Sequence, residues 1–267
     1  MLTEKDRKAP LYIVVAPALL LNLGIVGCAQ PRSAPAVAAP AAAPAPVKVE
    51  QAPPEPPPPP PGPVAASPEV YTVVAESEAA RLLLATWAPG QGDAMHSHPE
   101  YVMYALTDMN WQGTQLDGSE VGGTVGAGQV LTPSGTLAGH STRNAGESEA
   151  KMLILERKTG AVQSVPEGSA PASVEASPKQ YQVLAETPWV RVVKASWGPG
   201  ERDTMHSHPE VFVYAFADAN WRVRTAAGEQ TRLSMTAGQA QHQPPDAGHS
   251  IKNIGKQPAS VLIFEMK

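Results

Sequence analysis

The hexapeptide MHSHPE occurs twice in this chain, at residues 95–100 and again at residues 205–210. If the segment is extended, the two His side chains of each copy point to the same side, because side chains alternate across a strand. Two imidazoles at positions i and i+2 can bind one metal ion. The hexapeptide could therefore supply two ligands to a metal ion, and whether it does so depends on a third ligand from elsewhere in each copy.

Each hexapeptide lies inside a longer internal repeat with an offset of about 110 residues. The stretch ASPEVYTVVAE from Ala66 is matched by ASPKQYQVLAE from Ala176. Further on, AGQVLTPSGTLAGHSTRNAG from Ala127 is matched by AGQAQHQPPDAGHSIKNIG from Ala237, which is one residue shorter. The chain is therefore a tandem duplication.

The repeat predicts two domains, residues 66–158 and residues 176–267. Each spans about 90 residues, which is enough for one small domain. Residues 159–175 between them are rich in Ala, Ser, Pro and Gly and are expected to form a linker.

Both copies are predicted to be all-β. Short apolar or alternating segments are separated by Gly, Pro, Asn and Asp about every ten residues, and no segment has sustained helical periodicity. In the first copy these segments are residues 71–75, 81–87, 101–106 and 152–155. Many short strands with frequent turns are typical of a sandwich, a jelly roll or a barrel.

A third histidine accompanies the His-x-His pair in each copy. His140 and His249 occupy matching positions, and His242 is the only histidine outside the repeated set. A single buried His is usually a hydrogen-bonded structural residue, but retention of all three in both copies favours metal. The predicted ligands are His96, His98 and His140 in one copy and His206, His208 and His249 in the other.

At these motifs both copies resemble the cupin superfamily. The first cupin motif begins with Gly, five residues and then His-x-His, and the second contains Gly, a Pro-containing turn, His, and Asn four positions later. The matching residues are Gly90, His96 and His98, then Gly128, Pro133, His140 and Asn144; and Gly200, His206 and His208, then Gly238, Pro244, His249 and Asn253. The resemblance implies two tandem jelly-roll β-barrels, a bicupin, with a metal site inside each barrel.

The chain departs from the cupin pattern at the usual glutamate ligand. The positions four and five residues beyond the second His hold Val102 and Met103 in one copy, and Phe212 and Val213 in the other. We therefore expect a three-His site with open positions for water. The bound ion would be a divalent transition metal, Fe, Mn, Ni, Cu or Zn.

Glu100 and Glu210 are the acids nearest to the His-x-His pairs. We expect them to be hydrogen-bond acceptors beside the ligands or proton-transfer groups in catalysis. Two other acids, Glu156 and Glu265, are candidates for salt bridges with Arg81 and Arg191 respectively.

The N-terminus reads as a targeting segment. A basic start is followed by an almost wholly apolar stretch of roughly 16 residues that ends at Cys28, the only cysteine. Residues 1–28 resemble a bacterial lipoprotein signal, which implies lipidation of Cys28; an uncleaved anchor or an ordinary signal peptide is the alternative. Residues 29–65 are rich in Ala and Pro and are expected to be a disordered tether. These features predict a protein held in the bacterial cell envelope by lipid, facing the periplasm.

The formal net charge of −5, without a long Lys/Arg run, argues against a nucleic-acid partner. Three functions remain open. The first is a metal-dependent enzyme, with dioxygenase-like chemistry on a small anionic or enolisable substrate favoured. The second is a binding module for small molecules or metal, and the third is a structural protein whose metals brace the barrels. Duplication is consistent with two working sites, or with a large interface between sheets and turnover in one barrel.

Overall fold

The computed structural model describes residues 58–267, so the predicted signal segment 1–28, Cys28 and most of the predicted tether lie outside the described residues. In residues 58–267, no helix combines the length and the apolar character that crossing a membrane requires. The described residues fall within one compact unit.

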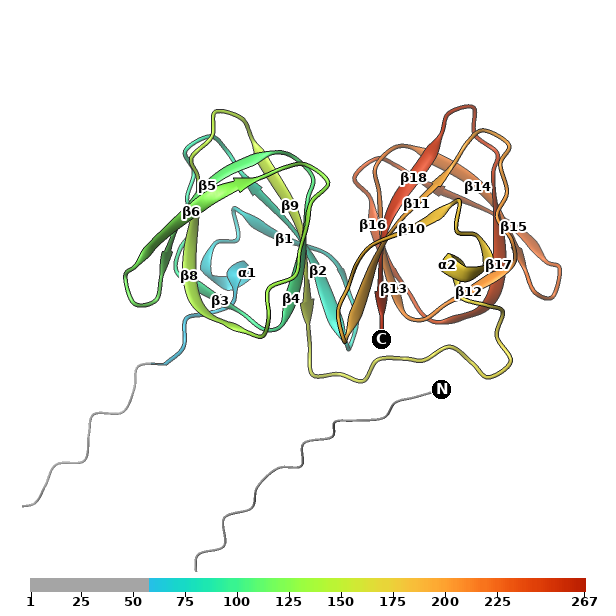
Figure 1. The fold of residues 1–267 in the computed structure, drawn as a ribbon, viewed down its shortest axis with the longest axis horizontal. Coiled ribbons are helices and arrows are strands. Elements are labelled where there is room, and N and C mark those ends of the chain that lie inside the picture. The colour runs from blue at the N-terminus through green and yellow to red at the C-terminus, as the bar shows by residue number, and fades with distance from the viewer. Residues whose placement is uncertain (1–57) are drawn as a thin grey trace, which may run out of the picture. The chain divides into compact units, whose positions relative to one another are not determined.

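The first copy contains a one-turn helix and nine strands (Figure 1). They are α1 (Pro63–Ala66), β1 (Tyr71–Glu76), β2 (Ala80–Trp87), β3 (His96–His98), β4 (Tyr101–Ala105), β5 (Met109–Gln115), β6 (Glu120–Val125), β7 (Val130–Leu131), β8 (Leu137–Asn144) and β9 (Ala150–Arg157).

The second copy repeats this order (Figure 1). Its elements are α2 (Ser173–Ala176), β10 (Tyr181–Glu186), β11 (Val190–Trp197), β12 (His206–His208), β13 (Val211–Ala215), β14 (Ala219–Thr225), β15 (Gln230–Met235), β16 (Ala240–Gln243), β17 (Asp246–Asn253) and β18 (Ala259–Met266). The segments that we expected to be strands are strands, and the all-β prediction is confirmed.

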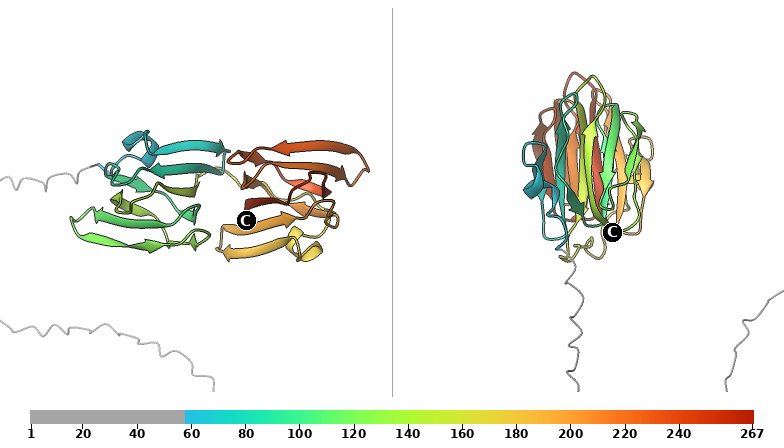
Figure 2. Two further views of the ribbon diagram at one scale, coloured as in Figure 1. Left: turned by 90° about the horizontal axis from the view of Figure 1, so that it is seen from above. Right: turned by 90° about the vertical axis from the view of Figure 1, so that its left-hand side faces the viewer.

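Each copy is a jelly-roll β-barrel built from two antiparallel sheets. In the first copy a five-stranded sheet, β1-β2-β9-β4-β7, faces a four-stranded sheet, β3-β8-β5-β6 (Figure 2). The second copy has the sheets β10-β11-β18-β13-β16 and β12-β17-β14-β15. We call the first copy barrel 1 and the second copy barrel 2.

The five-stranded sheets are buried on both faces, which explains their nearly continuous apolar sequences. Along β2, Leu83 and Trp87 pack inside barrel 1, whereas Leu82 points to the opposite face. This alternation follows from the two-residue period of a strand. Strand β4 is divided in the same way: Tyr101 faces the interior of the barrel and Tyr104 the opposite face.

The outer faces of the two five-stranded sheets share one hydrophobic core. Leu82 and Leu155 of barrel 1 belong to the same cluster as Phe212 and Phe264 of barrel 2. All four side chains are fully buried. Duplication has therefore produced an extensive interface between sheets. Such an interface was part of the second of our two explanations for the repeat, in which only one barrel turns over substrate.

The ordered part of each copy begins earlier than the sequence repeat suggested. Residues 58–65, which we assigned to the tether, are described, and the backbone N–H of Ser97 donates to the carbonyl of Pro61 at 2.9 Å. In barrel 2 the N–H of Ser207 donates in the same way to Pro171, within the expected linker, also at 2.9 Å. These short arms are ordered because they satisfy the free backbone edge of β3 and of β12.

Candidate metal centres

Strand register brings the three histidines of each barrel together. In barrel 1, β3 pairs with β8 so that His96 lies opposite His140, and His98 is two residues further along β3 on the same side. In barrel 2 the pairing of β12 with β17 places His206 opposite His249. In each trio one ligand atom per residue lies within 4.8 Å of the others, and all six residues are buried or half-buried.

Hydrogen bonds fix the tautomers of the His-x-His pair in barrel 1. The Nδ1 atom of His96 lies 2.8 Å from the carbonyl oxygen of Ala94, which can only accept, so this nitrogen carries the proton. Nδ1 of His98 lies 2.7 Å from Oε1 of Glu156 and donates to that carboxylate. The lone pairs of both residues are therefore on Nε2, and the two Nε2 atoms are 3.0 Å apart.

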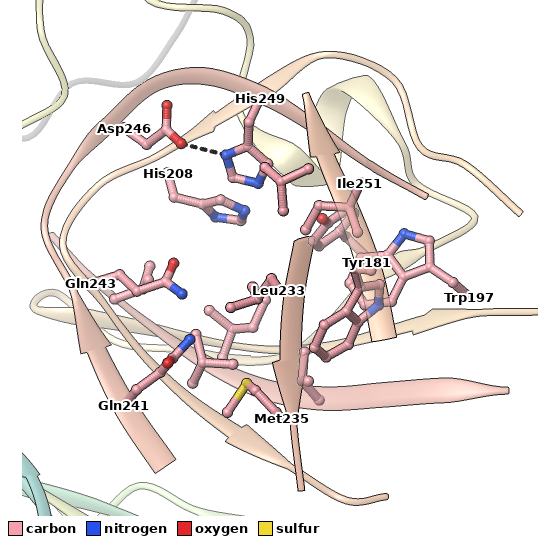
Figure 3. Close-up of a pocket in the computed structure, with 16 residues that line it drawn as sticks. Tyr181, Trp197, His208, Leu233, Met235, Gln241, Gln243, Asp246, His249 and Ile251 are labelled. Atoms are coloured by element: carbon pink, nitrogen blue, oxygen red, sulfur yellow. Dashed lines mark hydrogen bonds and ion pairs between the residues drawn. The ribbon is translucent and has the colours of Figure 1, made fainter. Parts of the chain in front are cut away.

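Barrel 2 repeats this arrangement. Nδ1 of His206 lies 2.7 Å from the carbonyl oxygen of Thr204, and Nδ1 of His208 lies 2.9 Å from Oε1 of Glu265. The Nε2 atoms of the two histidines are 3.1 Å apart. The third histidine, His249, also has a carboxylate on Nδ1, because Oδ2 of Asp246 is 2.5 Å away (Figure 3).

These trios fit a divalent transition metal. Two imidazole lone pairs facing each other repel unless a proton or a cation lies between them, and nitrogens that bind one ion at about 2.1 Å are about 3.0–3.4 Å apart. Nε2 of His140 is buried and has no hydrogen-bond partner among the described residues, as expected for an atom reserved for a metal. Burial lowers the pKa of His140 and of His206 to about 3, so both rings are neutral ligands at physiological pH.

A carboxylate with a paired arginine supports the second His of each trio. Glu156 accepts from His98 and from Arg81, whose Nε is 2.5 Å from Oε2. Burial raises the pKa of Glu156, but the hydrogen bond from His98 and the charge of Arg81 outweigh it, and the pKa is lowered overall. Glu265 is held by Arg191 at 3.4 Å, so both predicted salt bridges are confirmed. Such partners orient the ring and strengthen its donor nitrogen.

A tyrosine hydroxyl lies beside the first His of each trio. The hydroxyl oxygen of Tyr71 is 3.2 Å from Nε2 of His96 and donates to Oδ2 of Asp93 at 2.7 Å. The Tyr181 hydroxyl lies 2.9 Å from Nε2 of His206 and 3.0 Å from Oδ2 of Asp203. Burial raises the pKa of both phenols well above the usual value, so each keeps the proton that it donates to its aspartate.

Glu100 and Glu210 pair with residues other than the histidine trios. Glu100 pairs with Arg157 at 2.8 Å near the surface. Glu210 is buried, and its two oxygens lie 3.1 Å from Nε2 of His242 and 3.2 Å from the backbone N–H of Gln163. Glu156 and Glu265 occupy the acceptor positions that we expected for these residues. A role for Glu100 and Glu210 in proton transfer stays a prediction.

Each trio opens onto a cavity inside its barrel. The cavity of barrel 1 has a volume of about 420 Å³ and is lined by apolar side chains that include Tyr101, Met103 and Leu131. The cavity of barrel 2 is about 180 Å³, and His208 and His249 face it (Figure 3). Three imidazole ligands at the wall of a mainly apolar cavity would leave coordination positions of the ion free for a small molecule.

Several residues of these centres were not predicted from the sequence. Tyr71 and Asp93 recur as Tyr181 and Asp203, so retention in both copies was an available signal for them. Asp246 carries no such signal, because the matching position in the first copy is Leu137.

No family model and no curated protein matches this sequence. Solved structures are similar in fold. A single-residue variant of oxalate decarboxylase from Bacillus subtilis is 17% identical with a TM-score of 0.51, and the match covers 71% of this chain and 69% of that one. AerE from Microcystis aeruginosa is 15% identical with a TM-score of 0.52, and the match covers 70% of this chain and 88% of that one. The fold is therefore that of a bicupin, as the motifs implied.

Proposed function

We propose that this chain is an envelope-tethered bicupin metalloenzyme, dioxygenase-like in its chemistry, that acts on a small anionic or enolisable substrate. The observation that carries the proposal is the open centre: three histidines, with no carboxylate in the group, at the wall of an apolar cavity. The charge of a divalent ion is not cancelled in such a site, so an anion that binds it is stabilised.

The histidines would hold the ion, with Nε2 of His96, His98 and His140 in barrel 1 and of His206, His208 and His249 in barrel 2. A divalent transition metal bound there supplies Lewis acidity and, where it is redox-active, electrons for reaction with O₂. Oxalate decarboxylase, whose name states that it acts on a small dicarboxylate, has a similar fold and is compatible with an anionic substrate here.

The chain's own residues orient the substrate and supply a proton. The hydroxyls of Tyr71 and Tyr181 lie beside a ligand nitrogen, and each would donate to a substrate atom at the open positions by turning its proton away from Asp93 or Asp203. Glu100 and Glu210, our candidates for proton transfer from the sequence, would need to leave their present partners in order to act.

The tether completes the proposal. Lipidation of Cys28 and a Pro/Ala-rich segment would hold the barrels at the membrane on the periplasmic side. Both features lie outside the described residues and rest on the sequence.

Metal analysis followed by O₂-uptake measurements tests the function. The purified chain is loaded with Fe, Mn, Ni, Cu or Zn and mixed with a panel of carboxylates and diketones, and products are detected by mass spectrometry. We expect about two metals per chain and product from at least one redox-active form. Binding of the panel without any product would replace the enzyme with a small-molecule binding module. Metal that only stabilises folding, without ligand binding, would indicate a structural role.

A further inference from the structure

The two centres differ in charge at one equivalent position. On β8, Leu137 lies opposite His98; on β17, Asp246 lies opposite His208 in the same register. Asp246 accepts from Nδ1 of His249, whereas Nδ1 of His140 has the Thr142 hydroxyl 3.4 Å away. Barrel 2 therefore holds one additional negative charge beside its trio.

The charged groups that pair directly with the ligand histidines are otherwise equivalent in the two trios. Each trio has one Glu–Arg pair, Glu156 with Arg81 and Glu265 with Arg191. Each trio also has one Asp carboxylate near Nδ1 of its first histidine. Oδ1 of Asp93 is 3.7 Å from His96, and Oδ1 of Asp203 is 3.9 Å from His206. With the same ion in both sites, the metal, its ligands and the groups paired with them are more positive in barrel 1 than in barrel 2 by the charge of Asp246. An anion in the cavity of barrel 2 is repelled by that carboxylate, and water screens part of the repulsion because the Asp246 side chain is 42% exposed.

The two cavities also differ in polarity. Gln241 occupies the position of Leu131, since these residues pair with the equivalent Val213 and Met103. The carboxamides of Gln241 and Gln243 are directed into the cavity of barrel 2 (Figure 3). Amide groups both donate and accept, so a hydroxylated ligand satisfies them, whereas the apolar body of a ligand would leave them without hydrogen-bond partners.

The cavities differ in size for a reason visible in the sequence. Gly123 lines the cavity of barrel 1, and the equivalent residue in barrel 2 is Leu233. The side chain of Leu233 takes up space that stays free in barrel 1, where the cavity volume is about 420 Å³ against about 180 Å³. Barrel 1 also has Tyr101 stacked on His98, with ring centroids 4.7 Å apart, where barrel 2 has Val211.

We propose that barrel 1 is the barrel that takes the anionic substrate, and that this substrate is a carboxylic acid with an apolar body, such as an aromatic or branched α-hydroxy or α-oxo acid. Its carboxylate meets the more positive centre, and its body fills the cavity formed by Tyr101, Met103 and Leu131. Barrel 2 discriminates against this ligand by the charge of Asp246, the two carboxamides and the smaller volume. The inference rests on the proposed function and assigns its substrate class and its barrel.

A matched pair of acids tests the assignment. Mandelate and glycolate chelate a metal through the same α-hydroxy acid group and differ in one phenyl ring. Affinities are measured by isothermal titration calorimetry on the full-length Zn²⁺ form. His208→Ala leaves barrel 1 as the loaded barrel, and His98→Ala leaves barrel 2. We expect mandelate to bind barrel 1 at least about tenfold more tightly than barrel 2, and glycolate to discriminate less.

Exchange of the differing residues separates charge from size. Leu137→Asp in barrel 1 should weaken both acids by about tenfold, and Asp246→Leu in barrel 2 should strengthen both. Gly123→Leu should weaken mandelate much more than glycolate. This substitution is sterically allowed, because a Cβ at Gly123 meets the Trp111 ring only at 3.6 Å.

Equal affinity of mandelate for the two barrels, preference for barrel 2, or no binding to either loaded barrel would overturn the inference. A Zn²⁺ content far below one per chain in the single-barrel variants would instead contradict the metal sites of the proposed function. Tight mandelate binding in barrel 1 without turnover of any acid would remove the enzymatic chemistry and leave the ligand assignment standing.

Discussion

Replacing Glu156 with Gln should weaken metal binding in barrel 1 and leave barrel 2 unchanged. The carboxylate accepts from Nδ1 of His98 at 2.7 Å. Gln keeps the size and an acceptor oxygen but removes the negative charge that makes Nε2 of His98 a better donor, and it leaves Arg81 without its partner.

The expected loss of metal affinity follows from the weaker hydrogen bond between residue 156 and His98. A bond to a charged group contributes about 1.5–3 kcal/mol and a neutral one about 0.5–1.5 kcal/mol, so the change costs about 1–2 kcal/mol. At about 1.4 kcal/mol per factor of ten, this corresponds to a fivefold to thirtyfold rise in the dissociation constant of one of the two ions.

Competition with a chromophoric chelator measures the effect. The wild-type chain and the variant are titrated with Zn²⁺ at one pH, and the two binding steps are fitted separately. Glu100→Gln is the matched control, because Glu100 is near His98 in sequence but pairs with Arg157 at the surface. The reasoning fails if Glu156→Gln weakens both ions equally, or if Glu100→Gln weakens one of them as strongly as Glu156→Gln does.

Four other sets of substitutions test the remaining parts of the structure. His96→Ala should remove about one metal per chain, measured by elemental analysis, and loss of both ions together would show that the barrels are not independent. Glu100→Gln combined with Glu210→Gln should preserve metal content and lower the turnover rate if these residues transfer protons; an unchanged rate would assign the proton to Tyr71 and Tyr181. Phe212→Ala should destabilise the chain by about 3–5 kcal/mol in denaturant unfolding, because Phe212 is fully buried in the core shared by the two barrels; a cost below about 1 kcal/mol would mean that this core contributes little. Cys28→Ser should release the protein from membranes in fractionation, and retention with an uncleaved signal would indicate a helical anchor instead.

The sequence alone predicted the fold and the two histidine trios that the structure brings together. Alternating strands, turn residues at short intervals and a repeat of about 110 residues predict two β domains. The spacing of His96 and His98 predicts their common side, because the two-residue period of a strand is a local property of the backbone. The third histidine of each trio was predicted because His140 recurs as His249 in the repeat, and this prediction did not depend on knowing which strands pair.

The tertiary structure decided which groups control those ligands. Glu156 reaches His98 across 58 positions of sequence, and Tyr71 reaches His96 across 25. Such contacts depend on the register of strands from distant segments, which is set by cooperative packing of the whole barrel and not by any local pattern.

The same holds for the core shared by Leu82 and Phe212, because the apolar period marks a buried face but not the partner that covers it. The difference between Leu137 and Asp246 has meaning only because both lie opposite the second histidine of their trio. That position exists only in the folded barrel, since it is created by the pairing of two strands that are far apart in the sequence.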